Sequence, residues 1–481
     1  MRLDALIGEA GVTQGALLLQ VVGDPATEVI GVAMDSRAVT PGVVFACVPG
    51  RRSDGHDFAP AAVAGGATAL VCERLLDLAV PQVLVSSVRR CLGPLADAAQ
   101  GHPSRALTVV GVTGTNGKTT TCALLHAIFQ AHGWSAVTLG TLTQHLTTPD
   151  APELQGRLAE VRDRGGHAVA MEVSSHALDQ CRVDAVQFAA GVLTNVTQDH
   201  LDYHRTMSAY FEAKAKLFSP DTTRVAVVNR SDRWGRVLLE RLAGSEMPVA
   251  TFSVDDAEGL ELGAGGSTFR WGGRAMRVRL GGRFNVENAL AAATCARELG
   301  IPSDSIAAGL ASVASVRGRF EPVDAGQSFT VLIDYAHTPD GLAQALRAAR
   351  ELTSGRLLVV FGAGGDRDHD KRPLMGRVAS ELADLAVVTS DNPRSEDPAA
   401  IVDAVVSGAI DRSRVVVELD RSRAIAAAVA SAAPGDVVVV AGKGHETGQD
   451  IGGRVHPFDD AAVAREAIQR ILASRRDRGQ A

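Results

Sequence analysis

The stretch GVTGTNGKTT, Gly111 to Thr120, decides the class of the central part of the chain. It follows ALTVVGV at 106–112, which is typical of a buried strand, and it leads into the helical run TCALLHAIFQAHG at 121–133. Glycines let backbone N–H groups turn toward phosphate oxygens, and a helix N-terminus adds the positive end of its dipole. Strand, glycine loop and helix in this order predict a nucleotide-binding domain.

Two side chains of this loop carry the expected phosphate chemistry. Lys118 would neutralise the terminal phosphates, and Thr119 would offer its hydroxyl to Mg²⁺. Five residues separate Gly111 from Gly117, one more than in the standard loop, so a strict pattern search misses it. The alternative is a glycine-rich turn with a solvated lysine, and the flanking strand and helix favour phosphate binding over it.

The length and composition of the chain limit the number of domains and the classes of protein to which it can belong. A chain of 481 residues predicts about three domains at roughly 150 residues each, and 46% hydrophobic residues supply several cores. The net charge of −7 argues against a general nucleic-acid binder. No run reaches ~18 apolar residues, so we expect no membrane span. The six cysteines form no CxxC pair, which favours reduced thiols in a cytoplasmic protein.

The rhythm of apolar runs and turn signals divides the chain into an α/β domain at 1–102, a central domain at 103–322 and a last domain at 323–481. The last domain shows buried-strand patterns that alternate with helical stretches, which predicts a parallel sheet with right-handed crossovers. Its strand candidates are 329–334, 356–362, 385–390, 414–420 and 436–442. The loops GAGGDRDHDK, DNPRSEDP and GKGHETGQD each follow one of these strands, so they should meet at one sheet edge.

Two further side chains suggest metal chemistry less decisively. Glu172 lies at the end of the candidate strand at 167–173 and His200 follows the one at 189–196, so both could reach bound phosphates and Mg²⁺. Each is equally well explained as a hydrogen-bonded structural group. Lys214 and its neighbour Lys216 lie in the helical run YFEAKAKLF, where spacing alone predicts two surface lysines.

A set of longer motifs then occurs in order along almost the whole chain. They are TGTNGKTT, EVSSHALDQCRV, TNVTQDHLDYH, YFEAKAKLF, GRFNVENALAA, VRGRFEPV, DYAHTPD, GDRDHDKRPLMG, DNPRSEDP and GKGHE. In these motifs the chain resembles the Mur ligases of peptidoglycan assembly. The resemblance implies an α/β protein of three domains: a small UDP-substrate domain, a central P-loop ATPase domain with a parallel sheet, and a C-terminal Rossmann-like domain that binds the amino acid.

The resemblance also implies a reaction. Within the family the chain is most similar to the ligases that add the third residue to UDP-N-acetylmuramoyl-L-alanyl-D-glutamate in the cytoplasm. ATP would convert the D-glutamate carboxylate to an acyl phosphate, which the incoming amine attacks. ATP and Mg²⁺ are the implied cofactors, the partners are small-molecule substrates, and a monomer is expected.

Site residues follow from the matching positions. The ATP set is Gly111, Val112, Thr113, Gly114, Thr115, Asn116, Gly117, Lys118, Thr119, Asn288 and Arg319. The metal set is Thr119, Glu172, His200 and Lys214, the last as a carbamate formed with CO₂. The UDP-muramoyl-dipeptide set is Met34, Ser36, Arg51, Arg52, Ser53, Thr147, Thr148, Ser174, Gln180 and Arg182. One departure from the family is Leu146, where asparagine is common.

The acceptor set is Arg367, Asp391, Asn392, Pro393, Arg394, Gly442 and Glu446. The form DNPR is the one associated with meso-diaminopimelate, whose distal carboxylate suits an arginine, so Arg394 is the predicted specificity residue. The alternative is an arginine that pairs with Glu396 or Asp397 on its own loop.

The alternative acceptors are L-lysine and L-ornithine. The other classes of protein that the sequence leaves open are a folylpolyglutamate-synthetase-like ligase, a P-loop NTPase without ligase activity and an inactive binding module.

Overall fold

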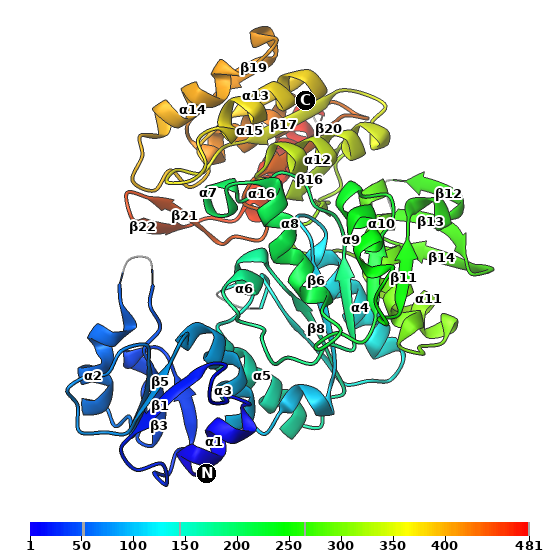
Figure 1. The fold of residues 1–481 in the computed structure, drawn as a ribbon. Helices are drawn as coiled ribbons and strands as arrows, with labels where there is room; N and C mark the ends of the chain where they lie inside the picture. Colours follow the sequence, from blue (N-terminus) through cyan, green and yellow to red (C-terminus); the bar gives the residue numbers. More distant parts are fainter. Residues whose placement is uncertain (51–52, 144–145, 264–265, 480–481) are drawn as a thin grey trace.

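The computed structural model describes the chain except for residues 51–52, 144–145, 264–265 and 480–481. Figure 1 shows three bodies in chain order: a small N-terminal domain in blue, a central domain from cyan to green, and a C-terminal domain from yellow to red. Each body is built on its own sheet, as the sequence predicts for an α/β protein of three domains.

The N-terminal domain is a five-stranded sheet in the order β1-β5-β4-β3-β2, parallel except for β1. Val44, Val71 and Val83 from its inner strands are almost fully buried beneath α1 and α3. Its elements are α1 (Leu3–Glu9), β1 (Leu18–Val22), β2 (Gly31–Ala33), β3 (Val43–Ala46), α2 (Ala59–Ala64), β4 (Ala69–Cys72), β5 (Gln82–Val85) and α3 (Val88–Ala99).

The central domain is a parallel sheet in the order β11-β10-β9-β6-β8-β7. Its strands are β6 (Thr108–Thr113), β7 (Ala136–Leu139), β8 (Ala168–Glu172), β9 (Ala190–Leu193), β10 (Ala226–Asn229) and β11 (Val249–Phe252). Its helices are α4 (Lys118–Ala131), α5 (Ala151–Asp163), α6 (Ser175–Asp179), α7 (Leu201–His204), α8 (Met207–Ala215), α9 (Arg233–Leu242), α10 (Arg283–Glu298) and α11 (Ser303–Ser312). Because β6 lies inside the sheet, the loop that follows it emerges near the middle of the strand ends.

A small antiparallel sheet of β12 (Glu258–Gly263), β13 (Gly266–Trp271) and β14 (Arg274–Val278) extends the central domain. Phe269, Trp271 and Met276 alternate along β13 and β14 and are buried in the core that also contains α4 and α10. The strict alternation of buried and exposed positions along β13 is typical of a sheet with one covered face.

The C-terminal sheet has the order β15-β16-β20-β17-β18-β19, and all its neighbours are parallel except β15 and β16. It contains β15 (Glu321–Pro322), β16 (Thr330–Asp334), β17 (Leu357–Phe361), β18 (Leu385–Val388), β19 (Val415–Val417) and β20 (Val437–Ala441), with helices α12 (Pro339–Leu352), α13 (Lys371–Leu382), α14 (Pro398–Ser407) and α15 (Arg421–Ser431). All five predicted strands are present. The expected boundary at 322 falls after β15, which already belongs to this sheet, so we place the boundary between α11 and β15.

Several helices begin where a side chain supplies the missing acceptor at the helix start. Ser87, Thr206, Thr338 and Asp420 each accept a hydrogen bond from the backbone N–H three residues later, at the starts of α3, α8, α12 and α15. These caps fix the start of α8, which carries Lys214, and of α12, which faces the central domain.

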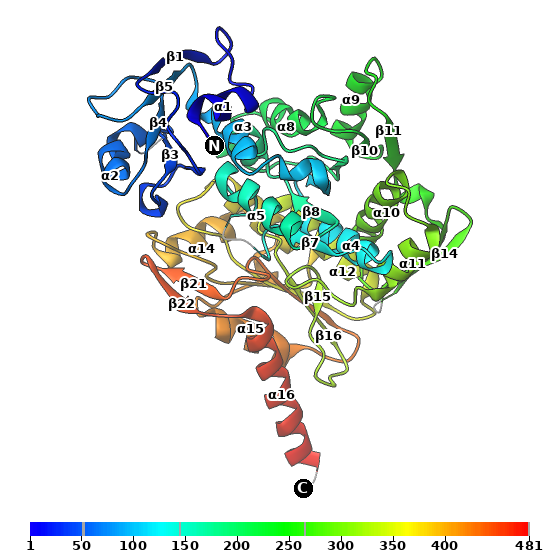
Figure 2. The ribbon, with the colours of Figure 1, turned by 90° about the horizontal axis from the view of Figure 1, so that it is seen from below.

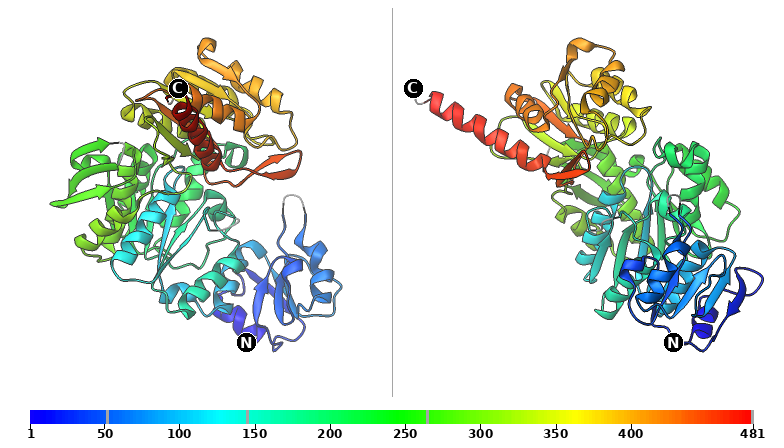
Figure 3. Two further views of the ribbon diagram at one scale, coloured as in Figure 1. Left: turned by 180° about the vertical axis from the view of Figure 1, so that it is seen from behind. Right: turned by 90° about the vertical axis from the view of Figure 1, so that its left-hand side faces the viewer.

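The chain ends with the hairpin of β21 (Gly448–Ile451) and β22 (Arg454–Pro457), followed by α16 (Asp460–Gly479). Figures 2 and 3 show that α16 begins against the C-terminal domain and then projects away from it. Among the helices in the described ranges, none combines the length and apolar character needed to cross a bilayer.

Candidate active site

The glycine loop joins β6 to α4, as predicted. Gly114 has φ 151° and Gly117 has φ 86°, a backbone region that other residues rarely adopt. A Cβ on Gly114 would overlap the Thr194 hydroxyl, and one on Gly117 would overlap the Asn288 side-chain oxygen. These two positions therefore need glycine for both conformation and space.

The predicted ATP set divides into two parts. Gly111, Val112 and Thr113 belong to β6, where they pair with β8 and β9 and support the loop from within the sheet. The part of the motif that lines the cleft comprises Thr115, Asn116, Gly117, Lys118, Thr119 and Thr120.

Lys118 and Thr119 lie at the start of α4, where the helix dipole favours anions. The Lys118 ammonium group donates to the carbonyl oxygens of Gly114 and Thr115, at 2.9 and 2.8 Å. Burial lowers the pKa of Lys118, although Glu172 and Asp199 oppose the shift. The Thr119 hydroxyl accepts a hydrogen bond of 3.1 Å from Nη2 of Arg319, which arrives from the interdomain segment.

Glu172 ends β8 and is 2% exposed. Its carboxylate accepts hydrogen bonds from the backbone N–H of Thr141 at 2.8 Å and from the Thr141 hydroxyl at 3.2 Å. These contacts point the carboxylate into the same cleft as Lys118 and Thr119.

His200 precedes α7 with φ 53°, and its ring lines the cleft beside Asp199. Its Nε2 lies 3.4 Å from a carboxylate oxygen of Asp199, and its ring packs edge-on against His176. Burial lowers the pKa of His200 to about 4, and Lys118 and Lys214 add to the shift while Asp199 opposes it. The imidazole is therefore neutral near pH 7, as a metal ligand must be.

Lys214 corrects the surface-lysine interpretation that its spacing suggested. Its side chain is 1% exposed, donates to the Gly114 carbonyl oxygen at 2.7 Å and lies over the Tyr210 ring. Burial lowers its pKa well below the ordinary range, and the nearby charge of Lys118 adds to the shift. Lys216 behaves as spacing predicts, because it is exposed and pairs with Asp179.

The four predicted metal residues gather around the phosphate loop without forming a complete protein cage. Thr119, Glu172 and His200 line the cleft, and Lys214 lies behind it on the Gly114 carbonyl. Within the described residues, no three His, Cys, Asp or Glu side chains are arranged to hold a metal ion. One carboxylate, one hydroxyl and one neutral imidazole fit Mg²⁺ shared with phosphates and water, because Mg²⁺ takes few protein ligands there.

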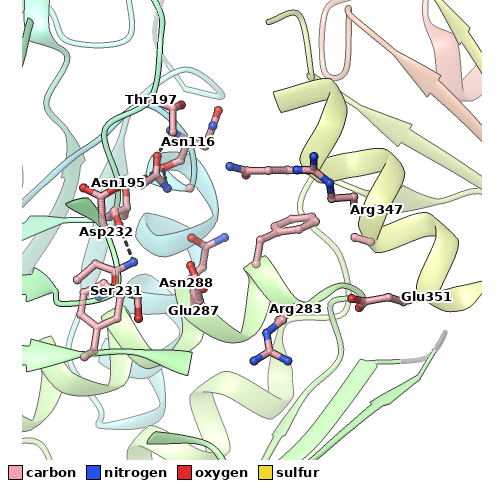
Figure 4. A pocket seen from close by; sticks show the side chains of 17 residues that line it. Asn116, Asn195, Thr197, Ser231, Asp232, Arg283, Glu287, Asn288, Arg347 and Glu351 are labelled. Atoms are coloured by element: carbon pink, nitrogen blue, oxygen red, sulfur yellow. Dashed lines mark hydrogen bonds between the residues drawn. The ribbon is translucent and has the colours of Figure 1, made fainter. Parts of the chain in front are cut away.

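A cavity of about 370 Å³ continues this cleft away from the loop. Figure 4 shows Asn116, Asn195 and Asp232 on the central domain facing Arg347 and Glu351 from α12. Asn288, predicted to contact the base, lines both this cavity and the phosphate cleft and is held by a hydrogen bond of 3.1 Å to Asn285. The two hollows are continuous, because Asn116, Gly117 and Asn288 line both.

The C-terminal domain closes the other wall of the phosphate cleft. Its contribution is Asp334, Tyr335, Ala336, His337 and Thr338, from the end of β16 and the cap of α12. Asn116 also donates to Asp340 at 3.2 Å. Sequence reasoning used the DYAHTPD motif only for the family resemblance and assigned no site residue to it, although its place after a strand of the last sheet was a usable signal.

Those residues of the predicted UDP-muramoyl-dipeptide set that lie on the central domain form one hydrogen-bonded cluster. Thr148 donates to the Glu172 carbonyl oxygen and accepts from the Ser174 N–H, both at 3.0 Å. Arg182 donates to the Thr148 carbonyl oxygen at 2.9 Å and to Gln180 at 2.8 Å. Thr147 lines the cleft itself, and Leu146 beside it is 41% exposed.

The remaining residues of the UDP-muramoyl-dipeptide set lie on the N-terminal domain. Met34 and Ser36 follow β2 and are half-buried, and the exposed Ser53 accepts a backbone hydrogen bond from Gly50. No hydrogen bond within the described part of the chain links these three side chains to the central cluster. Arg51 and Arg52, also in the predicted set, lie outside the described residues.

The three loops of the last sheet meet as predicted. Arg394 donates to the Gly365 carbonyl oxygen, and Asn392 donates to Glu446 at 2.8 Å. A Cβ on Gly364 would lie 3.2 Å from Arg394 Nη1 and 3.8 Å from Arg367 Cγ, so both arginine side chains converge there. Pro393 and Gly442 complete the set, Gly442 with φ 116° close against the Asp391 carboxylate.

The alternative role for Arg394, a pair with an acid on its own loop, is wrong. Glu396 instead accepts from Arg372 at 2.8 Å and lies 3.4 Å from His369. Asp397 uses its carboxylate to cap α14. Arg394 has φ 53°, a backbone region unusual for arginine, which directs its guanidinium toward the glycine loop of residues 362–365.

The fold and the cleft are those of a multidomain α/β protein whose phosphate-type loop lines a cleft between the central and C-terminal domains. Residues 28–102 match the description "Mur ligase family, catalytic domain", residues 112–296 match "Mur ligase middle domain", and residues 318–444 match "Mur ligase, glutamate ligase domain".

The similar proteins of known name agree with these matches. UDP-N-acetylmuramoyl-L-alanyl-D-glutamate--2,6-diaminopimelate ligases from Geobacillus kaustophilus and Streptomyces coelicolor are 45% and 44% identical to it, each over 93% of this chain and over 96% and 94% of their own. A solved structure described by the same enzyme name is 32% identical, with a TM-score of 0.69 over 98% of this chain and 99% of its own. Folylpolyglutamate synthase from Mycobacterium tuberculosis, complexed with ADP and AMPPCP, shares the fold at 22% identity and a TM-score of 0.59, over 72% of this chain and 91% of its own.

The chain belongs to the Mur ligase family, and it is an ATP-dependent, ADP-forming ligase. Membership in this family excludes the alternative of a P-loop NTPase without ligase activity.

Proposed function

We propose that this enzyme joins meso-diaminopimelate to the D-glutamate carboxyl group of UDP-N-acetylmuramoyl-L-alanyl-D-glutamate through an acyl phosphate. One observation carries the proposal. Lys118 and Glu172 of the central domain and residues 334–338 of the C-terminal domain line a single cleft, into which Arg319 also projects. ATP, a carboxylate and an amine can therefore meet between the two domains.

The order of the chemistry follows from the carboxylate itself. A carboxylate is too electron-rich for an amine to attack, so it needs a leaving group. Attack of the carboxylate oxygen on the terminal phosphorus of ATP releases ADP and gives an acyl phosphate. The amine then adds to the acyl carbon, and the tetrahedral intermediate expels phosphate with the original carboxylate oxygen, leaving the amide.

Cations and N–H groups of the cleft stabilise the phosphoryl transfer. Lys118 at the start of α4 and Arg319 from the interdomain segment both line the phosphate cleft and would share the charge that spreads over the transferred oxygens. Because Arg319 donates to Thr119 of the central domain and lies over Tyr335 of the C-terminal domain, transfer would require both domains to be in place around the phosphates, which would also limit the access of water to the acyl phosphate.

Mg²⁺ fits the side chains around the loop. Thr119, Glu172, His200 and a carbamate on Lys214 would hold it, and when bound it neutralises phosphate charge. Support for the carbamate comes from geometry: Lys214 is fully buried, next to Lys118, on the carbonyl of Gly114. An anionic carbamate there would balance the cation of Lys118 and supply hard oxygen ligands.

Acceptor choice rests on the C-terminal loops. Arg394 offers a guanidinium group near Gly364 for a carboxylate, with the Arg367 side chain beside it, and Asp391 and Glu446 offer carboxylates for an ammonium group. This set suits an acceptor with a charged amino acid group at its far end. The names of the relatives, which are 2,6-diaminopimelate ligases, support the same acceptor over lysine or ornithine.

The donor substrate, UDP-N-acetylmuramoyl-L-alanyl-D-glutamate, would lie across the central and N-terminal domains. Thr147, Thr148, Ser174, Gln180 and Arg182 would bind the peptide and sugar end, and Met34, Ser36 and Ser53, with Arg51 and Arg52, the uridine diphosphate end. We also propose that the enzyme acts as a monomer. We also propose that it acts in the cytoplasm, where its nucleotide substrates are made.

The test uses oxygen transfer and an acceptor panel. Donor labelled with ¹⁸O in the D-glutamate carboxyl should deliver one labelled oxygen to orthophosphate for every amide formed. Turnover with meso-diaminopimelate should exceed that with L-lysine or L-ornithine by at least tenfold. Unlabelled phosphate alongside amide formation would refute the acyl phosphate, and faster turnover with lysine would refute the acceptor assignment.

A further inference from the structure

A buried charge network lies directly behind the acceptor residues and consists of Asp391, Arg421, Lys443, Glu446 and Asp460. We propose that Lys443 and Arg421 are positioning residues, which hold the side chains of Asp391, Asn392 and Glu446 in the arrangement that captures the ammonium group of the acceptor. This inference rests on the proposed function, because it assumes that those three residues bind the acceptor.

Lys443 is the centre of the network. Its side chain is fully buried, and its ammonium group donates to Asn392 Oδ1 at 2.9 Å and to Glu446 Oε2 at 2.8 Å. Asn392 Nδ2 donates to the same Glu446 oxygen at 2.8 Å, which closes a ring of three side chains. One lysine thus fixes residues from two separate loops, DNPR and GKGHE, relative to each other.

Arg421 anchors the network from α15. Its guanidinium donates two hydrogen bonds to Asp460, at 2.8 and 2.7 Å, and both side chains are completely buried. It also donates to the Ala441 carbonyl oxygen at 2.9 Å, next to Gly442. The ends of β18 and β20, α15 and the start of α16 are therefore joined at one point under the acceptor loops.

The network contains more carboxyl groups than cations. Three carboxylates, those of Asp391, Glu446 and Asp460, face the two cations Arg421 and Lys443. Oδ1 of Asp391 is buried without a hydrogen bond and lies 3.7 Å from the Lys443 ammonium. A buried acceptor oxygen without a donor is costly, so the site is suited to a ligand that brings a positively charged donor.

Lysine use in this chain supports a specific role for Lys443. The sequence contains five lysines against 43 arginines. Lys118 and Lys214 lie at the phosphate loop, Lys371 donates to the His337 carbonyl oxygen, and Lys443 lies behind the acceptor loops, so four of the five surround the reaction cleft. A compact ammonium fits a buried point between two oxygens where the larger planar guanidinium does not.

The charge of Glu446 depends on these neighbours. Burial alone would raise the pKa of Glu446, but Lys443 and the hydrogen bond from Asn392 outweigh burial and hold the pKa below its ordinary value. The other charged or titratable groups around this site are His445 on the same loop, Asp391, Arg421 from α15, Asp460 from α16, Lys371 from α13 and Tyr335 after β16. Removing the Lys443 charge should therefore make Glu446 and Asp391 harder to ionise.

The experiment measures steady-state kinetics of Lys443→Met with ATP, donor and meso-diaminopimelate. We expect the KM for the acceptor to rise by about 10- to 100-fold, as for other residues that orient ligands from behind, with the KM for ATP within twofold of wild type. The acid limb of kcat/KM for the acceptor should move to higher pH, because Glu446 and Asp391 become harder to ionise without the Lys443 charge, and the same profile for ATP should stay in place. In a Glu446→Gln background, the further substitution Lys443→Met should raise the KM for the acceptor little beyond the effect of Glu446→Gln alone.

Lys216→Met serves as the matched control, because Lys216 is an exposed lysine outside the cleft. If Lys443→Met does not fold, Lys443→Gln keeps a hydrogen-bond donor without the charge and should show the same two changes. An unchanged acceptor KM and pH profile, or equal rises in the KM for acceptor and ATP, would overturn the inference. Failure of the wild-type enzyme to use meso-diaminopimelate would instead overturn the proposed function.

Discussion

Arg319 and Thr119 join the interdomain segment to the phosphate loop through a hydrogen bond of 3.1 Å from Nη2 to the threonine hydroxyl. The Arg319 guanidinium is also centred over the Tyr335 ring, 4.4 Å from its centroid. The arginine therefore contacts the phosphate loop of the central domain and the loop that follows β16 in the C-terminal domain. Its position makes the cleft sensitive to how the two domains are placed.

Arg319→Lys should lower kcat by about 100-fold, because a preorganised donor to transition-state charge contributes on that scale. The KM for the UDP-linked donor should change less than threefold. Arg317→Lys is the matched control, since Arg317 pairs with Asp459 at the surface. Steady-state phosphate release measures both variants, and equal activities would remove Arg319 from the reaction.

Lys214→Ala should lower kcat by about 100-fold or more while leaving the protein folded, because the variant loses the proposed anionic ligand of the metal. Formate or acetate should restore part of the activity by supplying a carboxylate, whereas Lys216→Ala should behave as wild type. Mass spectrometry under CO₂ should also find one added carbamate on the wild-type protein. Rescue by amines in place of carboxylates would contradict the carbamate.

The sequence was sufficient to predict those parts of the site that depend on local pattern. Gly114, Gly117 and Lys118 could be recognised because a phosphate loop needs glycines at fixed places between a strand and a helix. The meeting of the three C-terminal loops could also be predicted, because parallel strands end at one edge.

The parts that depend on packing were not predictable from spacing. Lys214 and Lys216 have the same chemistry and lie two residues apart, yet one is buried beside the phosphate loop and the other is paired at the surface. Lys443 and Arg421 lie 22 positions apart, and only in the folded domain do both come close to Asp391. The sheet β12–β14 was also missed, because its short alternating strands lie between stronger helical patterns.

The stability of the protein should fall between pH 6.5 and 4 partly because of His176. Burial lowers the pKa of His176 to about 4, and the nearby His200 and His204 add to the shift. Between these pH values the unfolded chain binds a proton that the folded chain does not, so the free energy of unfolding falls as pH falls.

His176→Gln should therefore flatten this dependence by up to about 1.4 kcal/mol per pH unit, the limit for one proton. Urea unfolding at pH 7, 6 and 5 measures the slope. His167→Gln, at a surface histidine, should leave the slope unchanged. A slope in His176→Gln equal to that of wild type would show that His176 binds a proton equally in both states.

Arg394→Ala tests the specificity assignment most directly. The variant removes a guanidinium positioned over the 362–365 loop, and the loss of a charge-assisted pair of hydrogen bonds, about 2–3 kcal/mol, corresponds to a rise of about 30- to 150-fold in the KM for meso-diaminopimelate. The KM for ATP should stay within twofold, and Arg412→Ala at the surface should change neither. Because L-lysine lacks the distal carboxylate, any residual turnover with lysine should be nearly unaffected by Arg394→Ala. A parallel loss with both acceptors would place Arg394 in loop structure and leave the choice of acceptor to Arg367.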